Sequence, residues 1–276
     1  MYYIFIVYGS NILKVLSQVK LDYLPFILII SIIQYLLSAW RWHFIARKTE
    51  SKIYYKDAIK FYYISGFLNN VLPTGILGDV YRTLNIKINN EKKNIFKAIQ
   101  SVVLERLSGQ LALFISFILS LFLFFIINEK YEASLYVIGV IILLYLILYQ
   151  LILYKKDNKY VINFKYIFSG RRLLKHILMS LIIVLTYIST YIICALSLNL
   201  DIDILSFFVF APIVLFSMAL PISIGGWGIR EITALLISFL LGLSVASSVT
   251  VAIVYGILNF ICSLPGAFFL LKTRTT

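Results

Sequence analysis

The amino-acid sequence predicts an all-α, polytopic integral membrane protein that forms a single transmembrane domain over residues 1–276. Hydrophobic residues make up 61% of the chain and charged residues only 13%, a composition too apolar for a soluble domain with a polar surface. Several charge-free runs reach the roughly 20 residues that a helix needs to cross a hydrocarbon core about 30 Å thick. We therefore expect about six or seven crossings, together with two hairpins that enter the membrane and return to the same side.

The first predicted crossing runs from Leu24 to Phe44 and contains one charged residue, Arg41. Because Arg41 lies near the end of the run, we expect its long side chain to extend to the interface beside two tryptophans. The next apolar stretch, 61–86, is too short for two crossings and a turn. It predicts a re-entrant hairpin that turns near Pro73 to Gly78.

The rest of the chain supplies the remaining predicted membrane segments. Three charge-free runs each predict one crossing: Leu107–Ile127, Ala133–Tyr154 and Ile177–Leu200. Residues 204–231 predict a second re-entrant hairpin, with its turn at 221–228. The run from Ile232 to Leu271 would be about 60 Å long as one helix, twice the membrane thickness, so we expect it to fold back at Gly242 to Ser248.

The positions of the cations predict the orientation of the chain. Nineteen of the 25 lysines and arginines fall in four regions, which the positive-inside rule assigns to the cytoplasm: Arg41–Lys60, Lys87–Lys97, Lys155–Lys175 and Lys272–Arg274. The expected location is the cytoplasmic membrane, with the C-terminus in the cytoplasm. Because the cations flank membrane segments, the net charge of +13 indicates contact with lipid headgroups rather than nucleic acid.

Two eleven-residue stretches share Leu, Pro, Ile, Gly and Arg in register: Leu72–Arg82 (LPTGILGDVYR) and Leu220–Arg230 (LPISIGGWGIR). Irregular backbone at membrane depth cannot face lipid, so both stretches must line protein or a wet cavity. The second stretch follows an acidic connection at 199–203, which is expected outside, so its hairpin enters from the opposite face. Opposed, related hairpins indicate an inverted repeat with a substrate path at its interface.

Three blocks in order resemble the lysylphosphatidylglycerol synthase/flippase transmembrane-domain family: Phe67–Arg82, Glu105–Gly109 and Pro221–Glu231. The Arg41-Trp42 pair, at the end of an early predicted helix, resembles a further sequence feature of this family. The resemblance covers the chain from about Leu24 onward and implies a membrane domain that moves lipid, best known fused to an aminoacyl-lipid synthase. The chain departs from the family pattern at Leu77, where a second glycine is usual, and at its short first apolar stretch.

The predicted substrate path consists of polar, charged and helix-breaking residues in these blocks: Asn69, Asn70, Pro73, Gly78, Asp79, Arg82, Glu105, Arg106, Pro221, Gly225, Gly226, Arg230 and Glu231. An ionised side chain at mid-depth costs at least ~2.5–3.5 kcal/mol, so the charged members must be paired or wet. For Asp79 and Arg82 we favour a functional role in the path. Glu105 and Arg106 are as well suited to a structural position at the membrane interface as to the path. Asn69 and Asn70 are as well suited to capping broken helices as to lining the path.

Other residue types give no indication of a metal or a cofactor. His43 and His176 lie at predicted helix ends, where we expect them to meet lipid phosphate or water, and neither has cysteines or carboxylates at ligand spacing. Cys194 and Cys262 lie in separate apolar runs and predict no disulfide. The sequence therefore predicts no metal site and no cofactor.

These observations favour translocation of a phospholipid or a lipid-linked sugar without enzymatic chemistry. The expected partners are membrane lipids: an anionic or aminoacylated phospholipid, or a polyprenyl-linked sugar; a separate synthase or glycan-pathway enzyme and a homo-oligomer are left open. One alternative is an intramembrane transferase that uses Asp79, Glu105 and Glu231 as a base or metal ligands, although the longest polar connection is too short for a nucleotide-sugar domain. Another is an accessory subunit of an envelope-polysaccharide or lipid assembly machine.

Overall fold

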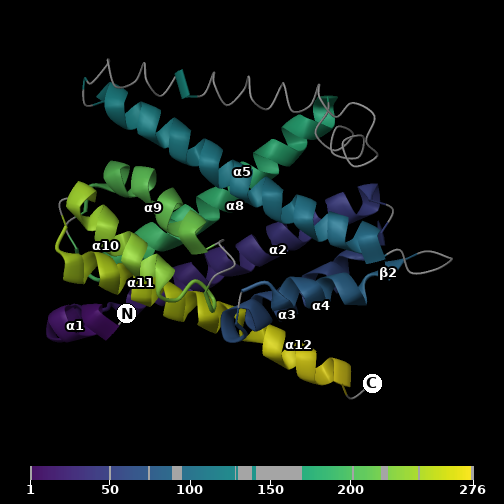
Figure 1. Cartoon of the computed structure of the whole chain (residues 1–276), viewed down its shortest axis with the longest axis horizontal. Coiled ribbons are helices and arrows are strands. Elements are labelled where there is room, and N and C mark those ends of the chain that lie inside the picture. Colours follow the sequence, from purple (N-terminus) through teal and green to yellow (C-terminus); the bar gives the residue numbers. More distant parts are fainter. Residues whose placement is uncertain are drawn as a thin grey trace.

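A computed structural model describes the chain except for residues 1, 50, 74, 89–94, 128, 130–138, 141–169, 201, 219–222, 242 and 275–276. The regular secondary structure of the described part is helical, apart from one short pair of strands (Figure 1). The helices are α1 (Tyr2–Leu16), η1 (Leu21–Tyr23), α2 (Leu24–Lys48), α3 (Tyr55–Val71), α4 (Leu77–Asn85), α5 (Ile95–Ile127), α8 (Gly170–Ser197), α9 (Ile204–Met218), α10 (Ile229–Leu241), α11 (Val245–Ser263) and α12 (Pro265–Arg274). The strands are β1 (Ser51–Lys52) and β2 (Lys87–Ile88).

The described residues contain four helical segments that are long and apolar enough to cross a membrane: Leu21–Lys48, Ile95–Ile127, His176–Ser197 and Val245–Lys272. The protein is therefore a multi-pass membrane protein with an all-α fold. The predicted crossing Ala133–Tyr154 lies outside the described residues. Helix α5 begins at Ile95 rather than at Leu107 and, with 33 residues, is about 50 Å long. Glu105 consequently lies inside this helix, whereas the sequence suggested the end of a span.

Helices α3 and α4 pack against each other and form a helical hairpin, here called hairpin A. The chain turns between Val71 and Leu77, as the sequence predicted, although α3 begins at Tyr55, before the predicted start. Strand β1 immediately precedes α3 and β2 follows α4, and the two pair antiparallel, with Ser51 opposite Ile88. Hairpin A therefore begins and ends at the same end of the molecule.

Helices α9 and α10 also pack against each other and form hairpin B. Its turn before Ile229 contains Gly225, Gly226 and Gly228, whose φ angles are +56°, +82° and +89°. This left-handed backbone favours glycine because a Cβ is strained there. Helix α10 ends at Leu241, and the chain folds back into α11, which begins at Val245 and packs on α10. This interruption overlaps the start of the bend predicted at Gly242 to Ser248, although α11 already begins at Val245.

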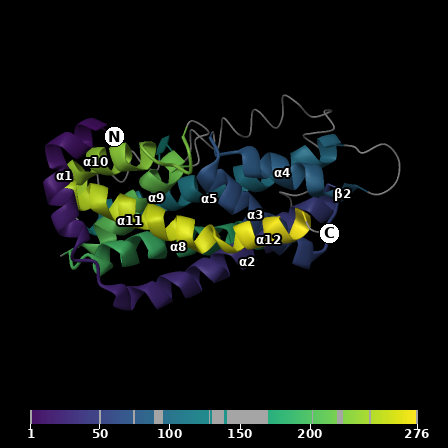
Figure 2. The ribbon, with the colours of Figure 1, turned by 90° about the horizontal axis from the view of Figure 1, so that it is seen from below.

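The two hairpins lie toward opposite ends of the long axis of the molecule (Figure 1). Helices α1 and α10 gather at one end, whereas β2 and the end of α12 lie at the other, and both views agree on this (Figures 1 and 2). The turns of the hairpins meet between these ends. A Cβ added at Gly75 would lie 3.4 Å from the Ser223 carbonyl oxygen, and one at Gly225 would lie 3.0 Å from Asn70 Cα. The two sequence-related stretches are thus in contact.

Candidate functional site

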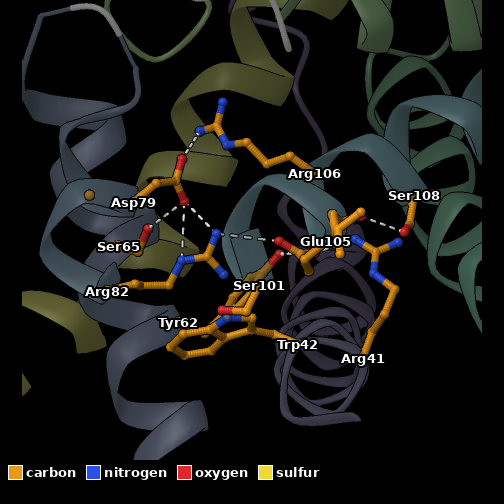
Figure 3. A network of polar contacts seen from close by, with 12 residues as sticks. Arg41, Trp42, Tyr62, Ser65, Asp79, Arg82, Ser101, Glu105, Arg106 and Ser108 are labelled. Atoms are coloured by element: carbon orange, nitrogen blue, oxygen red, sulfur yellow. Dashed lines mark hydrogen bonds and ion pairs between the residues drawn. The ribbon is translucent and has the colours of Figure 1, made fainter. Parts of the chain in front are cut away.

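A chain of alternating charges lies beside the turn of hairpin A (Figure 3). At its centre, the Glu105 carboxylate on α5 pairs with Arg41 of α2 and, at 3.3 Å, with Nη2 of Arg82 on α4. All three residues are buried; Glu105 is 2% exposed and Arg41 4%. Three different helices are therefore joined through one carboxylate.

Asp79 is the second acid of the network and is the third residue of α4, in its first turn. Its Oδ1 accepts from Nε of Arg82 at 3.1 Å and from the Ser65 hydroxyl at 3.3 Å, and its Oδ2 pairs with Arg106. Arg106 also donates to the Gly75 carbonyl at 2.9 Å. Arg106 thereby attaches the turn of hairpin A to α5.

The guanidinium of Arg82 lies between two aromatic rings, 4.8 Å from the ring centre of Trp42 and 4.7 Å from that of Tyr62. Both rings present their faces to the cation, which stabilises it in a desolvated place. The Tyr62 hydroxyl also donates to Glu105 at 3.2 Å. The Nη1 atom of Arg82 is buried without a hydrogen-bond partner among the described residues.

Arg41 does not extend to the interface, so the sequence prediction for this residue was wrong. Its side chain turns inward because Glu105 offers an opposite charge, and because Gly109 leaves room for it: a Cβ there would lie 3.2 Å from Nη2 of Arg41. His176 was likewise predicted to meet phosphate or water but is only 2% exposed. Its Nε2 lies 2.8 Å from the Ser108 hydroxyl. Arg41 and His176 therefore both contact polar side chains of α5 inside the helix bundle.

A cavity of about 270 Å³ lies between the two hairpins, bounded by the charge network. Both turns contribute to its wall, hairpin A through Gly75 and hairpin B through Gly225. Eight of the predicted path residues line it: Asn69, Asn70, Asp79, Arg82, Glu105, Arg106, Gly225 and Gly226. The structure thus brings together residues that lie far apart in the sequence and that belong to the three sequence blocks.

Gly78 and Asn69 hold hairpin A together. A Cβ at Gly78 would lie 2.1 Å from the Ser65 carbonyl oxygen, so only glycine lets α4 come this close to α3. The Gly78 amide donates to the Asn69 side chain at 2.7 Å, which satisfies one of the free N–H groups at the start of α4. Asn69 therefore combines the two interpretations of the sequence: it caps α4 and it lines the cavity.

Arg230 and Glu231 form a separate pair at the start of α10, away from the cavity wall. Both are fully buried, and their side chains approach within 2.6 Å. Glu231 also accepts from the Gly228 amide at 2.6 Å and so caps α10, while Arg230 lies over the Trp227 ring at 4.6 Å. This geometry supports a structural role for the pair.

Two of the predicted path residues are prolines. Pro73 is exposed in the turn of hairpin A, and Pro221 lies outside the described residues. The cavity wall also contains residues that the sequence did not suggest: Gln34, Tyr35, Ser38, Arg41, Tyr62, Tyr187, Tyr255 and Asn259. Arg41 and Asn259 are polar residues inside apolar runs, and this pattern would have indicated them. The tyrosines of the wall have no such pattern, because the chain contains 20 tyrosines.

The arrangement gathers three arginines and several uncharged hydrogen-bonding groups around one partly open cavity. Comparison with known proteins agrees with this membrane context. The family model for the lysylphosphatidylglycerol synthase TM region matches residues 2–266. No curated protein and no solved structure matches the chain.

Proposed function

The chain belongs to the family of lysylphosphatidylglycerol synthase transmembrane regions, and from this premise we propose that it translocates a phospholipid or a lipid-linked sugar across the cytoplasmic membrane. The path runs between the two hairpins. The observation that carries the proposal is the cavity of about 270 Å³ where the turns of hairpins A and B meet, because its partly apolar wall also contains charged and amide side chains. A polar headgroup needs such a place, because it cannot pass through hydrocarbon without compensating contacts.

The proposal treats hairpins A and B as re-entrant segments of an inverted repeat. The antiparallel pairing of β1 and β2 supports this for hairpin A, because it holds both ends of the hairpin together. The approach of the hairpins from opposite ends of the molecule supports the inversion (Figure 1). Broken helices that meet at mid-depth are a recurrent basis of alternating access in transporters.

The charge network gives the proposed path a means to bind and release its cargo. Asp79 and Arg106 are paired, yet the Arg106 side chain is 30% exposed beside the cavity. An incoming phosphate can replace Asp79 as the partner of Arg106. Neither Arg106 nor Asp79 is then left unpaired, because Asp79 keeps its ion pair with Arg82. Exchange of partners in this way avoids the cost of an isolated buried charge.

The expected orientation and partners complete the proposal. The cationic flanks support a cytoplasmic C-terminus, and the proposal takes membrane lipids as the direct ligands. A separate enzyme that makes the lipid, such as an aminoacyl-lipid synthase or a glycan-pathway enzyme, would supply the cargo. The protein itself needs no catalytic group for this activity.

Reconstituted vesicles test the proposal. The purified chain is placed in proteoliposomes that contain a headgroup-labelled phospholipid, or a lipid-linked sugar, and the accessible fraction of label is followed with a membrane-impermeant quencher. We expect exchange of the label between leaflets at a rate above that of empty vesicles. An unchanged rate for every candidate lipid would refute translocation.

Matched variants separate translocation from the two alternatives. Asp79→Asn alters the path, whereas Asp57→Asn removes an exposed carboxylate at the start of α3. A translocase loses exchange in the first variant and keeps it in the second, with both proteins assembled normally. Retained exchange in Asp79→Asn would contradict the role of the network. Formation of a new lipid product in detergent would instead identify a transferase. If Asp79→Asn changes the phenotype of cells although the natural chain exchanges no lipid in vesicles, the protein is an accessory subunit.

A further inference from the structure

The wall of the cavity between hairpins A and B has an excess of positive charge. Among the described residues that line it, three are arginines, Arg41, Arg82 and Arg106, and two are acids, Asp79 and Glu105. One positive charge is therefore left without an acidic counterpart. A ligand that carries a negative charge would balance it, and a cationic ligand would add to it.

Both carboxylates are already occupied by arginines. Glu105 pairs with Arg41 and Arg82, and Asp79 pairs with Arg82 and Arg106. An ammonium group in the cavity would have to displace a guanidinium and leave it unpaired in a buried place, which is strongly unfavourable. The described wall offers no free carboxylate to a cationic headgroup.

The arginines, in contrast, have donors to spare. Nη1 of Arg82 is buried and has no hydrogen-bond partner among the described residues, although the residue lines the cavity. The partly exposed Arg106 lies beside it, joined through Asp79 (Figure 3). Guanidinium groups are well suited to phosphate because they donate in a planar, two-pronged geometry.

Uncharged polar side chains form a further part of the wall, next to apolar ones such as Leu113, Ile183 and Leu215. Amides and phenols from five helices contribute: Gln34, Asn70, Gln110, Tyr187, Tyr255 and Asn259. Each of these groups donates and accepts hydrogen bonds, as a hydroxyl does. With about 270 Å³, the cavity is slightly smaller than typical small-molecule sites of about 300–1,000 Å³, a size that suits a headgroup rather than a whole lipid.

We infer that the cavity selects a lipid headgroup made of a phosphate and an uncharged, hydroxyl-bearing group such as glycerol or a sugar, and that it disfavours a cationic, aminoacylated headgroup. This inference rests on the proposed function and specifies its cargo. The phosphate binds at Arg82 and Arg106, and the hydroxyls bind the amides and phenols. Selectivity arises because a cationic headgroup meets the unbalanced positive charge.

Calorimetry on the full chain in detergent tests this selectivity without requiring transport. The probes are dihexanoyl phosphatidylglycerol, its lysyl ester, dihexanoyl phosphatidylcholine, and free glycerol 3-phosphate. We expect phosphatidylglycerol to bind at least tenfold more tightly than the lysyl ester and phosphatidylcholine. Equal or tighter binding of the lysyl ester would overturn the inference, and equal binding of free glycerol phosphate would overturn its assignment to a lipid.

A charge variant tests the electrostatic cause. Gln110→Glu places a carboxylate on the cavity wall, whereas Gln18→Glu makes the same change at an exposed residue on the chain after α1. We expect the preference for phosphatidylglycerol over its lysyl ester to fall at least tenfold in Gln110→Glu and to stay unchanged in Gln18→Glu. An unchanged preference in both variants would contradict the inference. Should Gln110→Glu fail to fold, the affinity order of the natural chain still decides.

The two proposals fail in different ways. If the chain binds phosphatidylglycerol selectively but never moves it in vesicles, the proposed translocation fails while the headgroup selectivity stands. If the chain exchanges the lysyl ester between leaflets faster than phosphatidylglycerol, translocation stands and the selectivity is overturned.

Discussion

Gly225 lies directly against Asn70, where a Cβ added to the glycine would come within 3.0 Å of the asparagine Cα. The two residues belong to hairpins that are more than 100 residues apart in the chain. Both residues line the cavity, so their contact forms part of its wall. The geometry of the site therefore depends on the backbone of both motifs as well as on their charges.

Gly225→Ala is expected to separate the turns. The residue has a φ of +56°, so alanine adds strain of about 1–3 kcal/mol, and its methyl group meets Asn70. We expect a lower unfolding temperature and slower lipid exchange in vesicles. Gly139→Ala is the control, because a Cβ there has no neighbour within 4 Å. A Gly225→Ala protein as stable and active as this control would contradict the close contact.

Gly78→Ala should open hairpin A itself. The added methyl group would lie 2.1 Å from the backbone oxygen of Ser65, and backbone cannot move aside as a flexible side chain can. Overpacking of this kind costs about 1–3 kcal/mol, and it shifts the adjacent Asp79 away from Arg106. Thermal unfolding in detergent measures the stability loss, and faster proteolysis between α3 and α4 reports the opening. Unchanged proteolysis would show that the helices do not pack as described.

Glu105→Gln is expected to be among the most destabilising substitutions on α5. It leaves Arg41 and Arg82 facing each other in a buried place without the carboxylate that joins them. Loss of one partner from a buried ion pair costs about 3–5 kcal/mol. Glu129→Gln makes the same change at an exposed residue and should stay within about 0.5 kcal/mol of the natural chain. Denaturant unfolding of both variants gives the comparison.

Arg106→Gln should loosen the turn of hairpin A while leaving the fold intact. Arg106 is the residue that bonds the Gly75 carbonyl and pairs with Asp79, yet its side chain is partly exposed and Asp79 retains Arg82. We expect faster hydrogen exchange at amides 75–79 with little change in unfolding temperature. Lys56→Gln removes an exposed cation from α3 and serves as the control. Equal exchange in the two variants would argue against the tether.

The start of α9 should respond to acid. Hydrogen bonds from the Ser206 hydroxyl, and from the backbone amides of Ser206 and Leu205, hold the pKa of Asp203 below its usual value. The ionised cap therefore contributes fully above the unfolded pKa of about 4, and this contribution is lost as the pH falls through the lower pKa of the folded state. Stability measured between neutral and acidic pH should show this loss. Asp203→Asn keeps a capping oxygen without ionisation, so the part of the pH dependence due to this residue should disappear.

The sequence predicted much of the fold because long apolar runs have few alternatives in a membrane. The crossing near Leu24–Phe44, the turn near Pro73–Gly78 and the break after Leu241 all agree with the structure. Helix α5 was predicted too short, because polar residues such as Glu105 interrupt its hydropathy. Their partners on other helices, which allow the helix to continue through them, are not visible in a linear sequence.

The candidate site was predicted in the same uneven way. Asp79 and Arg82 stood out because charges beside helix breakers are costly in an apolar segment. Arg41 was placed at the interface, because a cation near the end of an apolar run usually extends to it. The structure instead turns it toward Glu105. The tyrosines of the wall resemble the many others in the chain, and only their position distinguishes them.

The sequence by itself determined the membrane class, the helical segments and the two related stretches, because hydrocarbon thickness and backbone hydrogen bonding limit what an apolar chain can form. Only the tertiary structure decided which charges pair. Arg41, Glu105, Arg82, Asp79 and Arg106 come from three helices and form one network, whereas Arg230 and Glu231 form a separate buried pair. The reason is that an ion pair depends on distances in space, and packing of the helices sets these distances.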